Sequence, residues 1–213
     1  MLLIGMFDSP FVRRVAITLK LLDMPFEHGN WSVGRDFDRI REFNPLGRVP
    51  TLVTDDGDKL MESAAILDYL DELAGPKRAL LPAAGPERRQ ALKLMAMATG
   101  AAEKGVMQLY ERVFRPEAKR HEPWVDRCRL QMAASLGEID RYVGERGVSR
   151  WLVGERMTQA DITAVCAFTF LNDALRVAAD SIMFQSLATL AARCESLPAF
   201  HDTHLPFFVP KGQ

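Results

Sequence analysis

The fold is decided by the stretch at residues 6–14, which reads MFDSPFVRR. The apolar segment 2–4 before it is typical of a buried strand, and the apolar spacing after it, up to Leu22, predicts a helix. Ser9 and Pro10 lie at the junction. The helix is expected to begin there, because serine is a preferred N-cap and proline suits the first helical position. Alone, this pair is an ordinary helix cap. At the end of a buried strand, the open N–H groups of the helix also favour an anion such as a thiolate.

The first 75 residues alternate strands with helices. In order, the expected elements are a strand at 2–4, a helix from Pro10, a strand at 26–28, a helix at 36–43, strands at 51–54 and 59–61, and a helix at 64–73. The first strand, helix and second strand form a βαβ unit, whose strands are parallel and whose crossover is right-handed. The last two strands form a hairpin. The order is therefore βαβαββα, an α/β domain over residues 1–75.

The rest of the chain has a different pattern. Prolines exclude a continuous helix from residues 76–86, so this segment is expected to be a linker. Residues 87–213 hold no strong strand candidate, which predicts an all-α domain. Helices are expected at 87–115, 123–146, 158–177 and 182–194, with a short turn after Pro198 and an apolar tail at 207–210. The fold class is α/β plus all-α, with a capping box predicted at Thr158 and Asp161.

Charge and composition restrict the partners. The 213 residues include 27 Lys and Arg against 28 Asp and Glu, so the chain offers no basic field to nucleic acid or to acidic membranes. No apolar run approaches the ~18–20 residues that span a bilayer. Cys128, Cys166 and Cys194 are odd in number and far apart, which argues against disulfides and zinc and fits a reducing cytoplasm. His201 and His204 lie one turn apart without a third ligand, so no metal is expected.

Two further short motifs point to a ligand. The Val49-Pro50 pair precedes a strand, where a cis bond would leave the polar backbone groups of Val49 free to pair with an extended peptide. The sequence does not show the isomer, and base rates favour the alternative of a trans proline at a strand edge. Glu62 and Ser63 open a helix, where open amides and a hydroxyl suit a carboxylate and the neighbouring carboxylate suits an ammonium. This combination fits an amino-acid head group, but alone it is also an ordinary helix start.

Together these motifs resemble those of the cytosolic glutathione transferases. The resemblance rests on SPFVRRV at 9–15, NPLGRVP at 44–50 and MES at 61–63, in this order and spacing, and it extends over the whole chain. It implies a thioredoxin-like N-terminal domain, an all-α C-terminal domain and a homodimer. It also implies glutathione as co-substrate, with no other cofactor and a hydrophobic electrophile as second substrate.

The resemblance assigns a role to each matching residue. Ser9 matches the serine whose hydroxyl bonds the glutathione sulfur, Val49 the residue that pairs with the cysteinyl unit before a cis proline, and Arg48 a basic position near the glycine carboxylate. Glu62 and Ser63 match the pair that holds the γ-glutamyl group. The implied glutathione-binding set is Ser9, Phe11, Arg48, Val49, Pro50, Glu62 and Ser63, and Arg35, Arg39 and Arg41 are further candidates for the glycine end.

The residues at positions 9–12 restrict the reactions that the resemblance implies. Relatives with cysteine at position 9 act as thiol reductases, whereas Ser9 and Val12 leave no redox sulfur here. The Ser-Pro-Phe sequence is similar to the tau-type arrangement in an otherwise bacterial-looking chain, and it departs from the serine-rich signature of maleylacetoacetate isomerases. Phe11, Met107, Tyr110 and Phe114 are the candidates for the lining of the electrophile pocket, and ordinary packing between helices is the alternative for them. The alternative is a non-catalytic relative that keeps the fold as a binding or interaction module.

Overall fold

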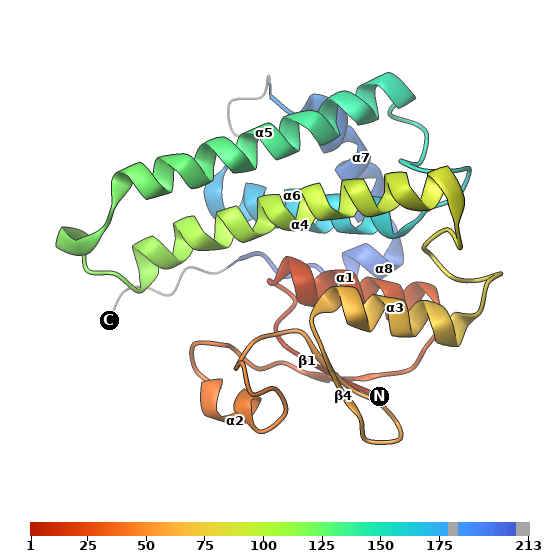
Figure 1. Ribbon diagram of the computed structural model, residues 1–213, viewed down its shortest axis with the longest axis horizontal. Helices are drawn as coiled ribbons and strands as arrows, with labels where there is room; N and C mark the ends of the chain where they lie inside the picture. The colour runs from red at the N-terminus through yellow and green to blue at the C-terminus, as the bar shows by residue number, and fades with distance from the viewer. Residues whose placement is uncertain (179–182, 208–213) are drawn as a thin grey trace.

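The N-terminal part of the chain folds around a small mixed sheet. The computed structural model describes residues 1–178 and 183–207 (Figure 1). The strands are β1 (Leu2–Ile4), β2 (Glu27–Gly29), β3 (Thr51–Val53) and β4 (Lys59–Met61), in the spatial order β2-β1-β3-β4. β1 is parallel to β2, with Leu3 opposite His28, and antiparallel to β3, with Leu3 opposite Leu52. The parallel βαβ unit and the hairpin predicted from the sequence are confirmed.

Three helices accompany the sheet. They are α1 (Pro10–Leu21), α2 (Phe37–Arg41) and α3 (Ser63–Ala74). In Figure 1, α1 and α3 lie between the sheet and the helical domain, whereas α2 lies at the far side of the sheet. Leu3 and Leu52 of the sheet are fully buried in one core with Val15 and Leu19 of α1 and Ile66 of α3. The sheet thus fixes α1, whose first residues follow directly on the turn after β1.

The helical domain consists of longer elements. They are α4 (Gly85–Val113), the 3₁₀ turn η1 (Glu117–Lys119), α5 (Glu122–Arg146), α6 (Gln159–Leu175), α7 (Gln185–Glu195) and α8 (Pro198–His201). α6 ends two residues before the expected boundary because Arg176 takes up a left-handed conformation with φ 57°. The predicted helix start at Ile182 and the tail residues 208–210 lie outside the described residues. In the described ranges no helix has the length and apolar character needed to cross a bilayer.

α6 is the central helix of this domain, and its start is held by a capping box. Asp161 Oδ2 accepts from the backbone N of Thr158 at 2.9 Å, and Asp161 Oδ1 accepts from the backbone N of Leu152 at 2.8 Å. The Thr158 hydroxyl accepts from the N of Ala160 at 3.3 Å. The capping box expected from the sequence is confirmed.

A partly buried ion pair joins the two domains. Arg13 of α1 donates from Nη1 to Glu195 Oε1 at 2.8 Å and from Nη2 to Glu195 Oε2 at 2.5 Å, at the end of α7. Its guanidinium also donates to the carbonyl oxygens of Thr203 and Phe200. A bidentate pair of this kind fixes orientation as well as distance. It therefore sets α1, and the turn that carries Ser9, against the helical domain.

Candidate functional site

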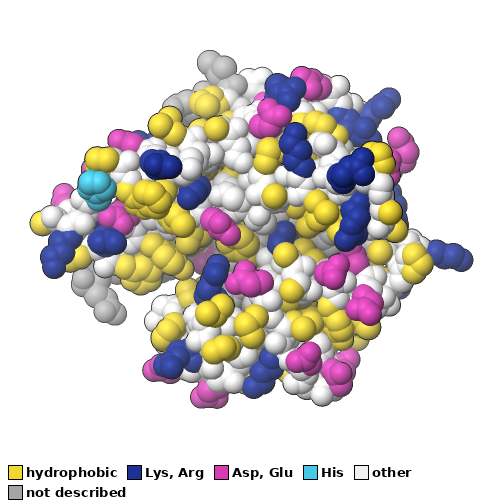
Figure 2. Space-filling view, in the orientation of Figure 1, with side chains coloured by type: hydrophobic (Ala, Val, Ile, Leu, Met, Phe, Trp, Pro, Cys, Tyr) yellow, Lys and Arg dark blue, Asp and Glu magenta, His cyan; other side chains and the backbone are white. Residues whose placement is uncertain are grey.

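A cavity of about 500 Å³ lies between the two domains. Its wall on the side of the small domain includes Ser9, Phe11, Arg48 and Val49, and its wall on the side of the helical domain includes Tyr110. Figure 2 shows the surface hollowed between the two parts of the molecule, with hydrophobic side chains along the upper rim. The cavity is therefore a mainly apolar space with a few polar groups on one side, which is the usual form of a small-molecule site.

Ser9 lies at the start of α1, in the wall of this cavity. Its backbone is extended (φ −76°, ψ 123°), and its Oγ accepts from the backbone N of Val12 at 3.4 Å, which confirms the predicted N-cap. Pro10 occupies the first turn, and no acidic side chain stands there to neutralise the open amides. Because the Ser9 oxygen accepts from the helix, its proton remains available for donation into the cavity.

The Val49-Pro50 bond is cis, which resolves the alternative that the sequence left open. Val49 lines the cavity just before β3, whereas Pro50 is buried and does not line it. Within the described residues, neither the N–H nor the C=O of Val49 makes a hydrogen bond. A free backbone donor and acceptor on one residue can pair with the backbone of a peptide-like ligand.

Arg48 and Glu62 are joined by an ion pair. Arg48 Nη1 lies 3.2 Å from Glu62 Oε1, and Arg48 lines the cavity while Glu62 does not. Glu62 has a left-handed backbone (φ 68°) and precedes Ser63, the first residue of α3. Ser63 is buried and also lies outside the cavity wall, where its Oγ accepts from Arg14 Nη2 at 2.7 Å. The expected head-group residues thus flank the cavity and are linked to it through Arg48.

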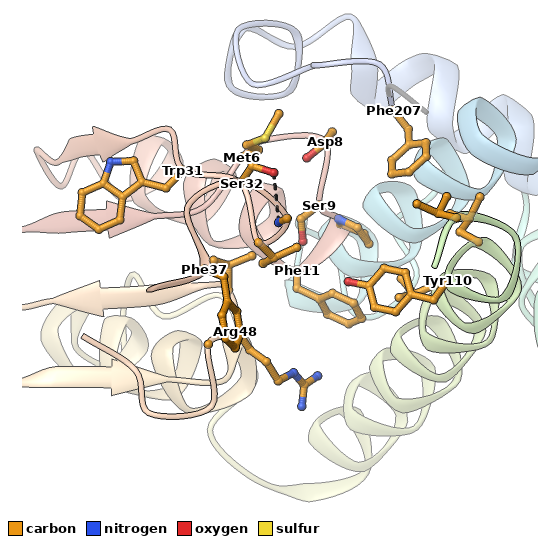
Figure 3. A pocket seen from close by; sticks show the side chains of 18 of the residues that line it. Met6, Asp8, Ser9, Phe11, Trp31, Ser32, Phe37, Arg48, Tyr110 and Phe207 are labelled. Carbon is orange, nitrogen blue, oxygen red and sulfur yellow. Dashed lines mark hydrogen bonds between the residues drawn. The ribbon is translucent and has the colours of Figure 1, made fainter. Parts of the chain in front are cut away.

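The predicted electrophile pocket needs one correction. Phe11, Tyr110 and Phe114 line the cavity, and Figure 3 shows the side chains of Phe11 and Tyr110 in its wall. Met107 does not line it: its side chain is partly exposed and its sulfur lies 3.8 Å from Lys104 Nζ. The inner stripe of α4 is 106, 109, 110, 113 and 114. A residue one position after 106 is rotated by about 100° away from that stripe.

Several cavity residues were not predicted from the sequence. They are Asp8, Trp31, Ser32, Phe37, Phe170 and Phe207 among others. The loop after β2 supplies Trp31 and Ser32, and a tryptophan directly after a strand of the βαβ unit was a usable signal. Phe170 and Phe207 pack edge to face with ring centroids 5.5 Å apart. Their proximity links α6 to the C-terminal segment, and no local pattern indicated it.

The three arginines proposed for the glycine end do not line the cavity. Arg35 pairs with Asp36 at 3.1 Å and Arg41 with Asp38 at 3.6 Å. The guanidinium of Arg39 lies over the Trp31 ring, 3.8 Å from its centroid. Each of the three therefore has a partner on the surface of the small domain, and among the described residues Arg48 is the cation in the cavity wall.

In the part of the chain that the structure describes, the charged side chains that line the cavity are Asp8 and Arg48, and both lie on the small-domain side. Burial raises the pKa of the Asp8 carboxyl group, although its hydrogen bonds to backbone N–H groups oppose the rise. Burial also raises the pKa of the Tyr110 hydroxyl; the positive charge of Arg48 opposes this rise and the negative charge of Asp8 adds to it. Tyr110 is thus a neutral hydrogen-bond donor or acceptor at neutral pH.

The protein's own thiols stand apart from this site. Cys128, Cys166 and Cys194 are free and buried, and none lines the cavity. Burial raises the pKa of Cys166 and of Cys194 to about 12, which makes both poor nucleophiles at neutral pH. In residues 1–178 and 183–207, no three histidine, cysteine or acidic side chains are grouped so that they could hold a metal ion.

Most of the chain matches one known family. Residues 3–78 match the model for the glutathione S-transferase N-terminal domain, and residues 103–198 match the model for the C-terminal domain. The chain therefore belongs to the glutathione S-transferase family. This finding agrees with the small mixed sheet, the helical second domain and the cavity between them.

Individual relatives agree with the family assignment. The chain is 33% identical over 172 residues to the uncharacterized GST-like protein YibF of Escherichia coli K12, covering 81% of this chain and 82% of the relative. It is 28% identical over 207 residues to a maleylacetoacetate isomerase of Pseudomonas aeruginosa, covering 92% and 91%. A crystal structure of a glutathione S-transferase from Methylobacterium radiotolerans, in complex with glutathione sulfonate, superposes with a TM-score of 0.83 at 31% identity, covering 100% of this chain and 95% of the other.

Proposed function

We propose that this protein is a glutathione transferase in which the Ser9 hydroxyl and the start of α1 hold the glutathione sulfur as a thiolate. The observation that carries the proposal is the position of Ser9, an N-cap hydroxyl in the wall of a cavity whose opposite wall is aromatic. The similar structure from Methylobacterium radiotolerans, solved with glutathione sulfonate, supports glutathione as the ligand.

The free energies involved are sufficient for this role. A free thiol has a pKa near ~8.5, and lowering it by ~2 units requires about 2.7 kcal/mol of preferential stabilisation of the thiolate. A hydrogen bond to a charged acceptor contributes ~1.5–3 kcal/mol, and a helix N-terminus contributes another ~0.3–1 kcal/mol. Ser9 and its helix together supply this amount. No general base is required, because Ser9 donates to an anion and does not itself attack.

The proposed reaction balances as follows. The thiol proton of bound glutathione passes to water, and the Ser9 O–H donates a hydrogen bond to the sulfur that is left. The sulfur electron pair then forms a bond to an electrophilic carbon. In a substitution, the leaving group departs with the electrons of the broken bond. In an addition, these electrons pass to a carbonyl oxygen of the electrophile, which takes a proton from water. Phe11, Tyr110 and Phe114 would bind an apolar electrophile.

The remaining site residues would hold the peptide of glutathione. We propose that the free N–H and C=O of Val49, before Pro50, pair with the cysteinyl unit, and that Phe11 packs beside it. Arg48 would bind the glycine carboxylate. The pair of Glu62 and Ser63 would bind the ammonium and carboxylate of the γ-glutamyl group.

The test of this function is the ultraviolet difference spectrum of the thiolate, recorded with saturating glutathione across a pH titration. We expect the bound thiol to titrate well below free glutathione in the wild-type protein and close to free glutathione in Ser9→Ala. Ser9→Thr keeps the hydroxyl and is the matched control. Binding without a shifted thiol titration would instead identify a non-catalytic glutathione-binding protein, and absence of binding would contradict both.

We also propose that the protein forms a homodimer, as the family resemblance implies. Light scattering coupled to size-exclusion chromatography is expected to give twice the chain mass of 23.9 kDa. A molar mass equal to that of one chain, across the accessible concentration range, would contradict the proposal.

A further inference from the structure

Two consecutive arginines of α1 are buried, and only one of them has a carboxylate partner within the described residues. Arg13 and Arg14 each have 3% of their surface exposed. Arg13 makes a bidentate ion pair with Glu195. Arg14 donates from Nη2 to Ser63 Oγ at 2.7 Å and from Nη1 to Thr163 Oγ1 at 3.2 Å, and both acceptors are neutral hydroxyls. Among the described residues, Arg14 has no ion-pair partner, and its Nε has no hydrogen-bond acceptor.

An unpaired buried charge is unfavourable, so its retention needs an explanation. Burial lowers the pKa of Arg14 to about 10, which still leaves the guanidinium protonated at neutral pH. Glu62 is the carboxylate whose charge acts on Arg14, and it is exposed and engaged by Arg48 at 3.2 Å. The described part of the chain therefore holds a buried positive charge for which it supplies no paired anion.

The hydrogen bond to Ser63 shows where such an anion would bind. Ser63 is the first residue of α3, and no side chain of the described residues caps this helix start. A serine hydroxyl has one proton to donate, and because the Ser63 oxygen accepts from Arg14, that proton is left for another acceptor. Hydrogen bonds in series polarise one another, so the guanidinium strengthens the Ser63 hydroxyl as a donor. The open amides of α3 add further donors beside it.

We propose that Arg14 is a positioning residue for the α-carboxylate of the γ-glutamyl group of glutathione, acting through Ser63. The guanidinium turns the Ser63 hydroxyl proton toward the carboxylate, and the carboxylate neutralises the buried charge. This inference rests on the proposed glutathione site. It adds to that site a residue of α1 that lies outside the cavity wall and does not itself contact the ligand.

A purely structural role for Arg14 makes a different prediction. Arg14 joins α3 to α6 through Ser63 and Thr163, so its loss could weaken every ligand equally by loosening the contact between the domains. A role toward one carboxylate affects only ligands that carry this carboxylate. Ligand selectivity therefore separates the two roles, whereas stability alone does not.

The experiment compares two ligands by titration calorimetry at neutral pH. One is glutathione, and the other is 4-aminobutyryl-cysteinyl-glycine, in which hydrogen replaces the α-carboxylate of the γ-glutamyl residue. The wild-type protein is expected to prefer glutathione by more than about tenfold. Arg14→Met removes the charge at similar volume and is expected to reduce this preference at least about fivefold, mostly by weakening glutathione.

Two further variants complete the design. Thr163→Val removes the bond of Arg14 to α6 and keeps its charge, so the preference for glutathione is expected to stay at the wild-type value. Arg14→Lys keeps a positive charge but lacks the planar, forked donors of the guanidinium. Its preference for glutathione is expected to lie between those of the wild type and Arg14→Met. It also carries the test if Arg14→Met does not fold.

The outcomes separate the inference from the function on which it rests. An Arg14 variant that folds and keeps the wild-type preference for glutathione overturns the inference. This includes a variant whose affinity for both ligands falls by the same factor. If the wild-type protein does not bind glutathione, both the proposed function and the inference about Arg14 fail. Binding of glutathione with a preference that is independent of Arg14 leaves the function standing and removes Arg14 from the site.

Discussion

Arg48 Nη1 lies 3.2 Å from Glu62 Oε1, so an ion pair connects the cavity wall to the residue that precedes α3. Both side chains are more than half exposed, and an exposed pair of this kind contributes at most ~1 kcal/mol to stability. Its importance is therefore expected to lie in ligand binding, where it holds two proposed glutathione contacts at a fixed separation.

Arg48→Ala is expected to raise the KM for glutathione about tenfold, because a charge-assisted contact to a carboxylate is lost. The thermal unfolding midpoint and the pH profile of conjugation should stay close to the wild-type values. Arg129→Ala is a matched control, since Arg129 forms an exposed pair with Asp126 on α5, away from the cavity. Equal KM values in wild type and Arg48→Ala would exclude the assigned role.

The cavity wall of α4 predicts different effects for two neighbouring positions. Tyr110 lines the cavity and packs edge to face on Phe114, with ring centroids 4.9 Å apart. Tyr110→Ala is expected to raise the KM for an apolar electrophile about tenfold through loss of apolar contact. Met107→Ala should leave it unchanged, because Met107 lies outside the cavity wall. Steady-state kinetics with the electrophile varied gives both values, and the reverse order of effects would contradict the assignment.

Packing of α4 on α6 yields a prediction on stability. A Cβ at Gly105 would meet Leu171 of α6, whereas one at Gly100 meets no atom within 4 Å beyond its own helix in the described part of the chain. Gly105→Ala is expected to lower the free energy of unfolding by about 1–2 kcal/mol through overpacking. Gly100→Ala should raise it by about 0.5–1 kcal/mol, because glycine is a poor helix former. Urea denaturation of both variants measures the difference, and equal effects would contradict close packing at Gly105.

The ion pair between the domains predicts a dependence of stability on acid. Burial alone would raise the pKa of Glu195, but its bonds to Arg13 and Thr169 outweigh burial and lower that pKa below the ordinary value of 4.5. The unfolded chain therefore binds more protons below this pH, so the stabilising contribution is present above 4.5 and is lost as the pH falls toward the folded-state pKa.

Glu195→Gln removes this titration. Its free energy of unfolding should be lower than that of the wild type at neutral pH, by an amount that shrinks as the solution is acidified. Chemical denaturation from about pH 7 down to about pH 3 tests this. A difference that stays constant across the whole range would show that the carboxylate charge of Glu195 does not contribute.

Much of the architecture could be predicted because its signals are local. The N-cap at Ser9, the capping box at Thr158 and Asp161, and the apolar strand segment 2–4 depend on residues that are close together in the sequence. Predicted helix boundaries that differ from the observed ones do so by one to three residues. The end of α6 at Leu175, for example, depends on the left-handed backbone of Arg176.

The composition of the cavity wall was harder to predict than the helix start at Ser9. Met107 was expected in the wall because it stands three residues before Tyr110, a spacing that fits several helical faces equally well. Which face of α4 meets the small domain depends on how α4 packs on α5 and α6. Phe170 and Phe207 enter the cavity for the same reason, from segments that lie far away in the sequence.

The sequence by itself determined the order of the elements, the helix start at Ser9 and the resemblance to the glutathione transferases, because propensity, capping and motif spacing act over a few residues. The tertiary structure alone decided the cis isomer before Pro50, the wall of the cavity and the different partners of two adjacent arginines. Arg13 meets Glu195 and Arg14 meets Ser63 because α1 lies between two domains, so that neighbouring side chains on the helix enter different surroundings.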